Sequence, residues 1–319
     1  MNAPVEVSVE PWRLTEPFEY AHDTIETVDV VRLRVDGAEG VIAADAGYGH
    51  DSGAIARQAR ELAAALAPRP DDPASLHGAL RDAEATTTGP ARMLVEMALL
   101  DRAARRAGVP VWRLLGLPEP GRIRLLHTVP FGASVPDARP VKVKLGGPGD
   151  ESLLRGLVGV PGPVLLDVNQ GWDATRWREL RPLVAAVAPT VLEDPVRDPA
   201  LLPEIRAALP GTAIILDEPV NSRTDVVRAA AVADGANIKP TRVGGLLSTL
   251  DALECLAGRG SARMIGCFLE PPRTIAYLAQ LAARFDWTDL DGHFWLTDDP
   301  VVMSYTLDSS QPGIPRIVY

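Results

Sequence analysis

The chain has 319 residues and a net charge of −10 at pH 7, with an isoelectric point near 5.1. This acidity argues against a nucleic acid or an anionic membrane as a partner, because no basic field exists to attract phosphates. Hydrophobic residues make up 46% and charged residues 23% of the sequence, which excludes a disordered or fibrous chain. No apolar run reaches 18 residues, so the sequence predicts no membrane-spanning helix.

The two cysteines, Cys255 and Cys267, stand in separate segments, which excludes a disulfide framework and a thiolate metal cluster. This usage is typical of a reducing compartment. The first residues lack the basic and apolar stretches of a signal peptide. We therefore expect a cytoplasmic protein, and the length fits one large domain or two ordinary ones.

The N-terminal part of the chain predicts an α+β unit. Within residues 5–48, an Asp36-Gly37 turn signal separates two apolar runs, which is typical of a hairpin. Helices are predicted over residues 52–66 and 89–107, where apolar residues recur at helical spacing.

From about residue 122 the pattern changes to short apolar runs that alternate with helical stretches, which is typical of parallel βα units buried on both faces. The runs are Leu125–Phe131, Val141–Leu145, Val164–Val168, Thr190–Leu192, Ala213–Leu216, Ala236–Ile238, Arg263–Phe268 and Trp287–Leu290. Eight runs predict a TIM-like (β/α)8 barrel, although such barrels typically have about 250 residues. The gap 132–140 is too short for an ordinary helix, so we expect a modified barrel whose first helix is missing or reduced.

Charged residues stand at or near the ends of the second to sixth runs, about one βα unit apart. They are Lys142, Lys144, Asp167, Glu193, Asp217 and Lys239. A single acidic residue after a strand is usually a helix cap, but that reading does not explain a set in register. Because the carboxyl ends of parallel strands form the mouth of a barrel, we expect these side chains to meet there.

Three carboxylates in one apolar mouth would repel each other and lose their hydration. A divalent cation removes both penalties, and an all-oxygen ligand set suits Mg²⁺. Lysines beside such a cation can act as general bases, because neighbouring positive charge lowers their pKa. The pattern therefore predicts metal-assisted removal of a proton next to a substrate carboxylate.

Several segments carry a resemblance to a known family. They read VKVKL (141–145), LDVNQGW (166–172), LEDPV (192–196), LDEP (216–219) and NIKPTRVGG (237–245). With these motifs the chain resembles the enolase superfamily, muconate-lactonizing-enzyme subgroup, over nearly its whole length. The resemblance implies an α+β capping domain over residues 1–121, with the tail 300–319 returning to it. It implies a barrel over residues 122–299 that carries the active site.

The resemblance also implies roles for individual residues. Asp167, Glu193 and Asp217 would bind one Mg²⁺ per subunit. Lys144 and Lys239 would be the acid/base residues on opposite faces of the substrate. The supporting residues would be Lys142, which lies beside Lys144 and lowers its pKa, and Asn169, Glu218 and Glu270. For Glu218 the alternative is a polar residue at the barrel rim.

A further pair, Asp289 and Asp291, resembles the Asp-x-Asp pair that binds the substrate α-ammonium in dipeptide epimerases. Carboxylates two residues apart on a strand point to the same side, which suits a cation. The alternative is an exposed acidic turn. Pro271-Pro272 and Pro219 depart from the family pattern, which puts the substrate specificity in doubt.

These features predict an isomerase that removes the α-proton of a small carboxylate substrate through a metal-stabilised enediolate. The chain resembles the dipeptide epimerase, N-succinylamino acid racemase and o-succinylbenzoate synthase members of this subgroup. The leading prediction is a racemase or epimerase of an amino-acid derivative or dipeptide. An o-succinylbenzoate synthase-type dehydratase and a cycloisomerase are alternatives on the same site. A catalytically silent barrel that binds a small acid is an alternative of another class. We expect a homo-oligomer.

Three histidines could lie near the pocket. His22 and His50 fall in capping-domain loops, where we expect surface positions, although either could contact the substrate. His293 follows the aspartate pair and is a candidate contact at the rim of the pocket.

Overall fold

The computed structural model describes residues 5–21, 23–121, 123–137, 140–256 and 261–296. Two short strands nearer the C-terminus, β12 (Thr306–Leu307) and β13 (Pro315–Arg316), are also described, and they pair antiparallel. The remainder of the predicted tail lies outside the described residues, as does His22.

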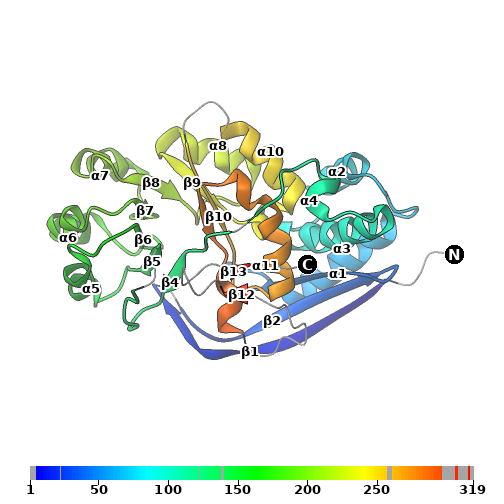
Figure 1. The fold of residues 1–319 in the computed structure, drawn as a ribbon, viewed down its shortest axis with the longest axis horizontal. Coiled ribbons are helices and arrows are strands. Elements are labelled where there is room, and N and C mark those ends of the chain that lie inside the picture. The colour runs from blue at the N-terminus through cyan, green and yellow to red at the C-terminus, as the bar shows by residue number, and fades with distance from the viewer. Residues whose placement is uncertain are drawn as a thin grey trace.

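The N-terminal part forms an antiparallel sheet of order β1-β2-β3 with helices packed on it (Figure 1). Its elements are β1 (Glu6–Tyr20), β2 (Asp23–Val35), β3 (Ala38–Ala44), η1 (Ala46–Tyr48), α1 (Ser52–Ala65), α2 (Pro73–Asp82), α3 (Gly89–Ala107) and α4 (Val111–Leu114). Asp36 and Gly37 adopt φ values of 50° and 77° between β2 and β3, so the predicted hairpin is confirmed. The predicted helix over residues 89–107 is α3, which Thr88 caps at its N-terminus.

The eight predicted apolar runs form the strands of one parallel sheet of order β11-β10-β9-β8-β7-β6-β5-β4. They are β4 (His127–Val129), β5 (Val141–Lys144), β6 (Val164–Asp167), β7 (Val191–Glu193), β8 (Ala213–Leu216), β9 (Gly235–Ile238), β10 (Ala262–Gly266) and β11 (Trp287–Asp289). A parallel bridge between Leu125 and Thr288 joins the two ends of the sheet. The predicted barrel is therefore confirmed.

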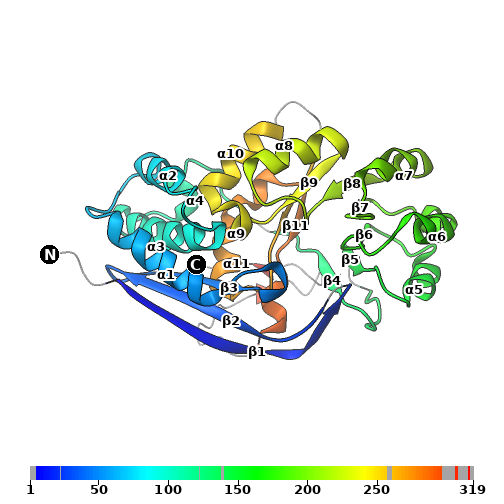
Figure 2. The same ribbon diagram turned by 180° about the vertical axis from the view of Figure 1, so that it is seen from behind.

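Helices follow most of the barrel strands and cover the sheet (Figure 2). They are α5 (Asp150–Leu157), α6 (Ala174–Val187), η2 (Pro199–Leu201), α7 (Leu202–Ala208), α8 (Arg223–Val232), α9 (Pro240–Val243), α10 (Leu246–Leu256), α11 (Pro272–Leu278), η3 (Ala279–Arg284) and η4 (Gly292–Trp295). Between β4 and β5 the described residues form no helix, which agrees with the predicted loss of the first one. Among the described residues, no helix is both long and apolar enough to cross a bilayer.

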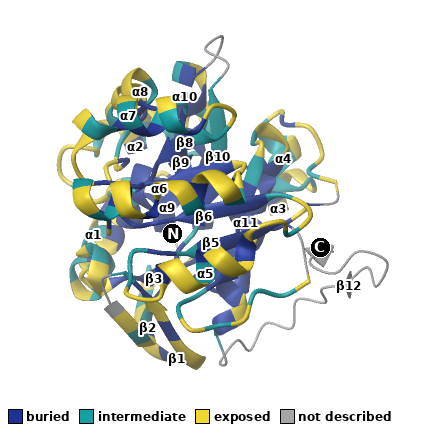
Figure 3. Ribbon diagram, turned by 90° about the vertical axis from the view of Figure 1, so that its left-hand side faces the viewer, coloured by how far each residue is buried: buried dark blue, intermediate teal, exposed yellow. Residues whose placement is uncertain are grey.

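Because successive side chains of a barrel strand point inward and outward in turn, the apolar residues form one cluster inside the barrel and another outside it. Leu165, Val191 and Ile215 pack together inside the barrel, whereas the residues on either side of them pack outward against the helices. Figure 3 shows the resulting buried strands surrounded by helices with exposed outer faces. Because side chains alternate along a strand, the residue two positions beyond each inward-facing one also points inward. In β6, β7 and the end of β8, these positions are Asp167, Glu193 and Asp217.

The β1-β2 ribbon extends from the capping helices to the barrel, along the lower side of Figure 1. At the end of the ribbon that reaches the barrel, the backbone carbonyl of Glu19 accepts a hydrogen bond from the backbone N–H of Phe131, which follows β4. Phe18 packs edge-on against Trp295 in η4, with ring centroids 5.1 Å apart. The ribbon therefore brings aromatic side chains to the mouth of the barrel.

Candidate active site

The predicted acidic and basic residues gather at the carboxyl ends of five consecutive barrel strands. Lys144 on β5, Asp167 on β6 and Glu193 on β7 are register neighbours across the sheet. Asp217 follows β8, and Lys239 follows β9. Since β5 and β9 are four strands apart in a sheet of eight, the two lysines lie on opposite sides of the mouth.

The sequence contains three lysines, and all three lie at this mouth. Away from the mouth, the sequence uses arginine instead of lysine throughout. Lys142, Lys144 and Lys239 all line one cavity. Arginine cannot give up its proton in a protein, but lysine can. The distribution therefore concentrates every basic side chain capable of proton transfer, histidines aside, at one place.

Lys142 lies among three carboxylates. Its Nζ atom is 2.9 Å from Asp167 Oδ2, 2.8 Å from Glu193 Oε2 and 2.6 Å from Asp289 Oδ2. Its side chain is only 2% exposed. Asn237 donates a further hydrogen bond of 2.8 Å to the other oxygen of Glu193, which fixes that carboxylate.

Lys144 is held by the neighbouring strand and the loop that follows it. Its Nζ atom lies 2.7 Å from Asp167 Oδ2 and 3.2 Å from Asn169 Oδ1. Asn169 in turn donates to Glu218 Oε1 over 2.7 Å, and the Tyr48 hydroxyl lies 3.3 Å from the same oxygen. The predicted supporting residues Asn169 and Glu218 thus form a chain of hydrogen bonds from Lys144 to Tyr48 in η1.

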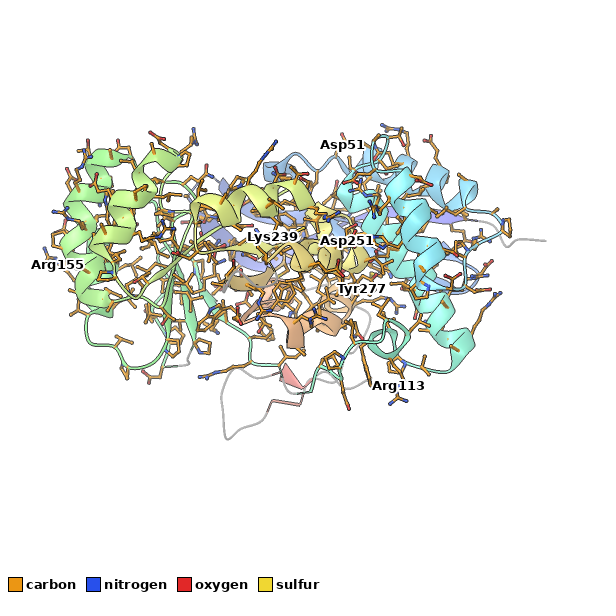
Figure 4. The ribbon with its side chains drawn as sticks, turned by 90° about the horizontal axis from the view of Figure 1, so that it is seen from above. Asp51, Arg113, Arg155, Lys239, Asp251 and Tyr277 are labelled. Atoms are coloured by element: carbon orange, nitrogen blue, oxygen red, sulfur yellow. The ribbon has the colours of Figure 1, made fainter. Side chains whose placement is uncertain are left out.

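Lys239 lies near the centre of the molecule, between the barrel helices and the capping helices (Figure 4). Its Nζ atom is 2.7 Å from Asp217 Oδ2 and faces the rings of Tyr48 and Phe268 at 5.2 and 4.7 Å from their centroids. These distances are those of cation–π contacts. Arg242 holds the other oxygen of Asp217 at 2.7 Å, so Asp217 has a fixed orientation.

The charges at the mouth shift the pKa values of the site residues. Burial would raise the pKa of Asp167, but Lys142 and Lys144 outweigh it and hold that pKa below its usual range. Burial and repulsion from Asp167 raise the pKa of Glu193 to about 8. Burial alone would lower the pKa of Lys144, and the positive charge of Lys142 also lowers it, as predicted. Attraction to Asp167 outweighs both effects and raises the pKa of Lys144 above its usual value. Unless a further cation neutralises Asp167, Lys144 keeps its proton at neutral pH.

The three predicted metal ligands are close together, but lysines stand between them. Among the described residues, no group of three or more His, Cys, Asp or Glu side chains is arranged to hold a metal ion as it stands. The donor set nevertheless fits Mg²⁺, because it consists of buried carboxylates that offer hard oxygen ligands. Lysine ammonium groups now neutralise two of these oxygens, Glu193 Oε2 at 2.8 Å from Lys142 and Asp217 Oδ2 at 2.7 Å from Lys239.

Asp289 and Asp291 are buried, at 7% and 4% exposure, so they do not form an exposed acidic turn. Both line the same cavity as the three lysines. Asp289 is paired with Lys142, whereas Asp291 accepts hydrogen bonds from the backbone N–H and the hydroxyl of Thr128, at 2.7 and 3.0 Å. Burial and repulsion from Asp289 raise the pKa of Asp291 to about 7.

The remaining predicted residues lie around the cavity. Glu270 is fully buried and joins the two parts of the fold, because it accepts from Ala43 of β3 and from the Thr241 hydroxyl. His50 is half-buried edge-on against Phe268, so the expected surface position is wrong for this residue. His293 is 5% exposed and is not among the residues that line the cavity, so it is no rim contact.

The cavity between the lysines is small. It offers a volume of about 60 Å³ to water-sized atoms, whereas ligand pockets usually have about 300 Å³ or more. Its outer wall consists of aromatic side chains of the capping sheet, the loop after β10 and η4, including Phe18, Phe268 and Trp295. The space between these side chains, as they stand, therefore holds a few waters.

Several residues of the site carry no sequence motif that predicts their role. Arg242 was visible in the motif that contains Lys239, but its contact with Asp217 depends on α9 turning back over the mouth. Thr128 gave no signal, because a single threonine in an apolar run is common. Tyr48 lies in η1 and Phe268 follows β10, so only the packing of the N-terminal part of the fold on the barrel brings them together.

The architecture is a parallel barrel with charged side chains at its mouth and an antiparallel sheet that packs over it. The Enolase C-terminal domain-like family model matches residues 138–307, and the Mandelate racemase / muconate lactonizing enzyme, N-terminal domain model matches residues 3–116. The chain therefore belongs to the mandelate racemase and muconate lactonizing enzyme family of the enolase superfamily, and it is an isomerase of the epimerase and racemase type.

The similar proteins include several epimerases. The hydrophobic dipeptide epimerase of Roseobacter litoralis is 31% identical over 271 residues, which cover 75% of this chain and 77% of that one. The L-Ala-D/L-Glu epimerase of Escherichia coli is 29% identical over 228 residues, or 66% of this chain and 70% of that one. The structure of a Cytophaga hutchinsonii dipeptide epimerase, complexed with Mg and D-Ala-L-Val, matches with a TM-score of 0.84 at 22% identity. That match covers 99% of this chain and 93% of the other, and it confirms the fold.

Proposed function

We propose that the protein is a Mg²⁺-dependent dipeptide epimerase that inverts one α-carbon by proton transfer between two lysines. The observation that carries this proposal is the placement of Lys144 and Lys239 on opposite sides of one cavity, in a chain with a single lysine besides. A substrate α-carbon between them would have a basic group on each face. Inversion requires this arrangement, because the proton leaves one face and returns to the other.

The two lysines would exchange roles according to the substrate. One, as the neutral amine, takes the α-proton, while the other, as the ammonium, gives a proton to the opposite face. One proton leaves the substrate and one enters it, so the product differs only in configuration. After the transfer, the lysine that was neutral is an ammonium and the other is a neutral amine. Proton exchange with solvent then restores the starting state of both.

The carboxylates Asp167, Glu193 and Asp217 would hold the Mg²⁺. This assignment is supported by their adjacent strand ends, by their burial and by the Mg in the related Cytophaga hutchinsonii structure. When bound, the ion would neutralise Asp167, which now holds the proton on Lys144, and would balance charge that develops on the substrate carboxylate.

Asp291 would bind the α-ammonium of the dipeptide. Asp289 already has Lys142 as its counter-charge, whereas the hydrogen-bond donors to the Asp291 carboxylate among the described residues are the neutral groups of Thr128. A substrate ammonium would therefore supply the cation that this buried carboxylate needs. The dipeptides in the names of the relatives all carry such an α-ammonium group.

The test uses L-Ala-L-Glu and L-Leu-L-Tyr in ²H₂O with Mg²⁺, followed by proton NMR. The proposal expects deuterium at the α-carbon of one residue together with formation of the epimer. A dehydrated product would instead support a dehydratase that uses one base, and a cyclised product a cycloisomerase. No exchange with any dipeptide of a wider panel would contradict the proposal and favour a barrel that binds a small acid without turnover.

A further inference from the structure

Glu96 and Asp150 are buried carboxylates that lie outside the mouth and have no part in the chemistry described above. Glu96 belongs to the capping helix α3 and is 0% exposed, and Asp150 begins the barrel helix α5 and is 1% exposed. Burying a carboxylate is costly unless it is well hydrogen-bonded, so each is expected to stabilise a particular local structure.

Glu96 binds the start of α10. Its Oε1 atom accepts from the backbone N–H of Leu246 at 2.5 Å and from the Tyr277 hydroxyl at 2.6 Å, and its Oε2 atom accepts from the N–H of Leu247 at 3.2 Å. A Cβ atom at Gly245 would collide with the same carboxylate. Glu96 therefore fixes the position of residues 245–247.

The segment that Glu96 holds is connected to Lys239 by one turn of helix. Across α9 and its C-cap, the backbone N–H groups of Val243 and Gly244 donate to the carbonyls of Lys239 and Pro240 at 3.2 and 2.9 Å, which fixes the helical turn that follows Lys239. Arg92, one turn before Glu96 on α3, donates to the carbonyl of Val243. Helix α3 thus contacts the segment that follows Lys239 at two points, through Arg92 and through Glu96. Figure 4 labels Lys239 and Tyr277 near the centre of the molecule.

Asp150 makes equivalent contacts beside the other lysine. Its carboxylate accepts from the backbone N–H groups of Gly146 and Gly147 at 3.1 Å, just beyond Lys144. It also accepts from Trp172 Nε1 at 2.6 Å, in the loop that follows Asn169. This carboxylate therefore ties the loop after Lys144 to the loop that carries its hydrogen-bond partner.

The two carboxylates act on different segments and share no contact in the described structure. Accordingly, we propose that Glu96 is the positioning residue of Lys239 and Asp150 that of Lys144, so that each controls proton transfer on one face of the substrate. The inference rests on the proposed function, because it needs two lysines that act on opposite faces. Neither carboxylate touches the substrate.

The experiment compares E96Q and D150N in ²H₂O with L-Ala-L-Glu and L-Ala-D-Glu. First, K144A and K239A assign which epimer loses its α-proton to which lysine. The rate of deuterium exchange from each epimer is then measured for the carboxylate variants at saturating Mg²⁺. We expect E96Q to slow exchange on the face of Lys239 by about 10- to 100-fold and D150N to do so on the face of Lys144, since small misplacements have such effects. The opposite face should change by less than about threefold.

Matched controls change the same charge on the same helices without touching the lysine segments. D101N lies on α3, where Asp101 pairs with Arg105 and Arg273, and E151Q lies on α5, where Glu151 pairs with Arg155. Both should leave the two exchange rates as in the wild type. If E96Q or D150N does not fold, Y277F and W172F remove one hydrogen bond to each carboxylate and should give a smaller loss on the same face.

The test depends on which face of the α-carbon shows the slower deuterium exchange. Equal losses on both faces, or losses on the wrong face, would overturn this inference while the wild-type exchange kept the proposed function. Absence of exchange in the wild type would overturn both.

Discussion

Lys142 and Asp289 form an ion pair of 2.6 Å that links the two groups of carboxylates at the barrel mouth. Through the same Nζ atom Lys142 also contacts Asp167 and Glu193, two of the proposed metal ligands. This lysine therefore stands where the charges of the proposed metal site and of the proposed ammonium site meet. Its proposed role is to balance the carboxylates rather than to transfer a proton.

Replacing Lys142 should make folding depend on Mg²⁺. In K142M, three buried carboxylates lose their common counter-charge. Removing one partner of a buried ion pair lowers the free energy of unfolding by about 3–5 kcal/mol. Mg²⁺ should restore much of this loss, so saturating Mg²⁺ should shift the urea midpoint more for K142M than for the wild type. The same loss with and without Mg²⁺ would contradict the assignment of Asp167 and Glu193 as ligands.

Asp217→Asn should weaken Mg²⁺ binding and reduce turnover by more than about 100-fold, the upper range for groups that only support a ligand. The fold should persist, because Arg242 still donates to the carbonyls of residues 217 and 218. Isothermal titration with Mg²⁺ measures the first effect and circular dichroism the second. D82N, at an exposed position on α2, is the control. Unchanged Mg²⁺ affinity in D217N would remove Asp217 from the ligand set.

Asp291→Asn should raise KM for a dipeptide about ten- to a hundredfold, because a charge-assisted hydrogen bond contributes about 1.5–3 kcal/mol. The amide matches the carboxylate in shape and can accept from the Thr128 N–H, so kcat should change less. An N-acetylated dipeptide, which has no ammonium group, should be almost insensitive to the substitution. Equal effects on both substrates would show that Asp291 does not bind the ammonium.

His50 should make the folded state sensitive to acid. Burial, together with Arg242 and Lys239, lowers the pKa of His50 to about 4, below the value near 6.5 of an unfolded chain. The folded state then binds fewer protons than the unfolded state, so this stability is present above pH 6.5 and is lost as the pH falls toward 4. Between pH 7.5 and 5, the free energy of unfolding measured by urea titration should fall by about 1–2 kcal/mol more in the wild type than in H50F. Parallel curves for H50F and the wild type would contradict the effect.

The sequence predicts the parts of the fold that depend on local periodicity. Continuous apolar runs indicate the eight strands, and the caps and glycines around residues 88–108 mark the boundaries of α3. The spacing of Lys144, Asp167 and Glu193 follows from the length of one βα unit. Their convergence could therefore be expected before the structure was known.

Other features depend on packing between distant segments, which periodicity does not encode. The Lys142–Asp289 pair joins strands at opposite ends of the barrel sequence, and it forms because the sheet closes. The burial of His50 depends on where the capping loop meets Phe268. The contact of Glu96 with the start of α10 crosses 150 residues of sequence. Such contacts become visible only when the two parts of the fold are assembled.

Lys144 and Lys239 are proposed to transfer protons on opposite faces of one α-carbon. The most direct measurement follows deuterium exchange from the two epimers of L-Ala-Glu in ²H₂O with K144A and with K239A. We predict that neither variant epimerises its substrate and that each still exchanges the α-proton of one epimer, a different one for each variant. Epimerisation by either variant, or exchange of the same epimer by both, would contradict the account.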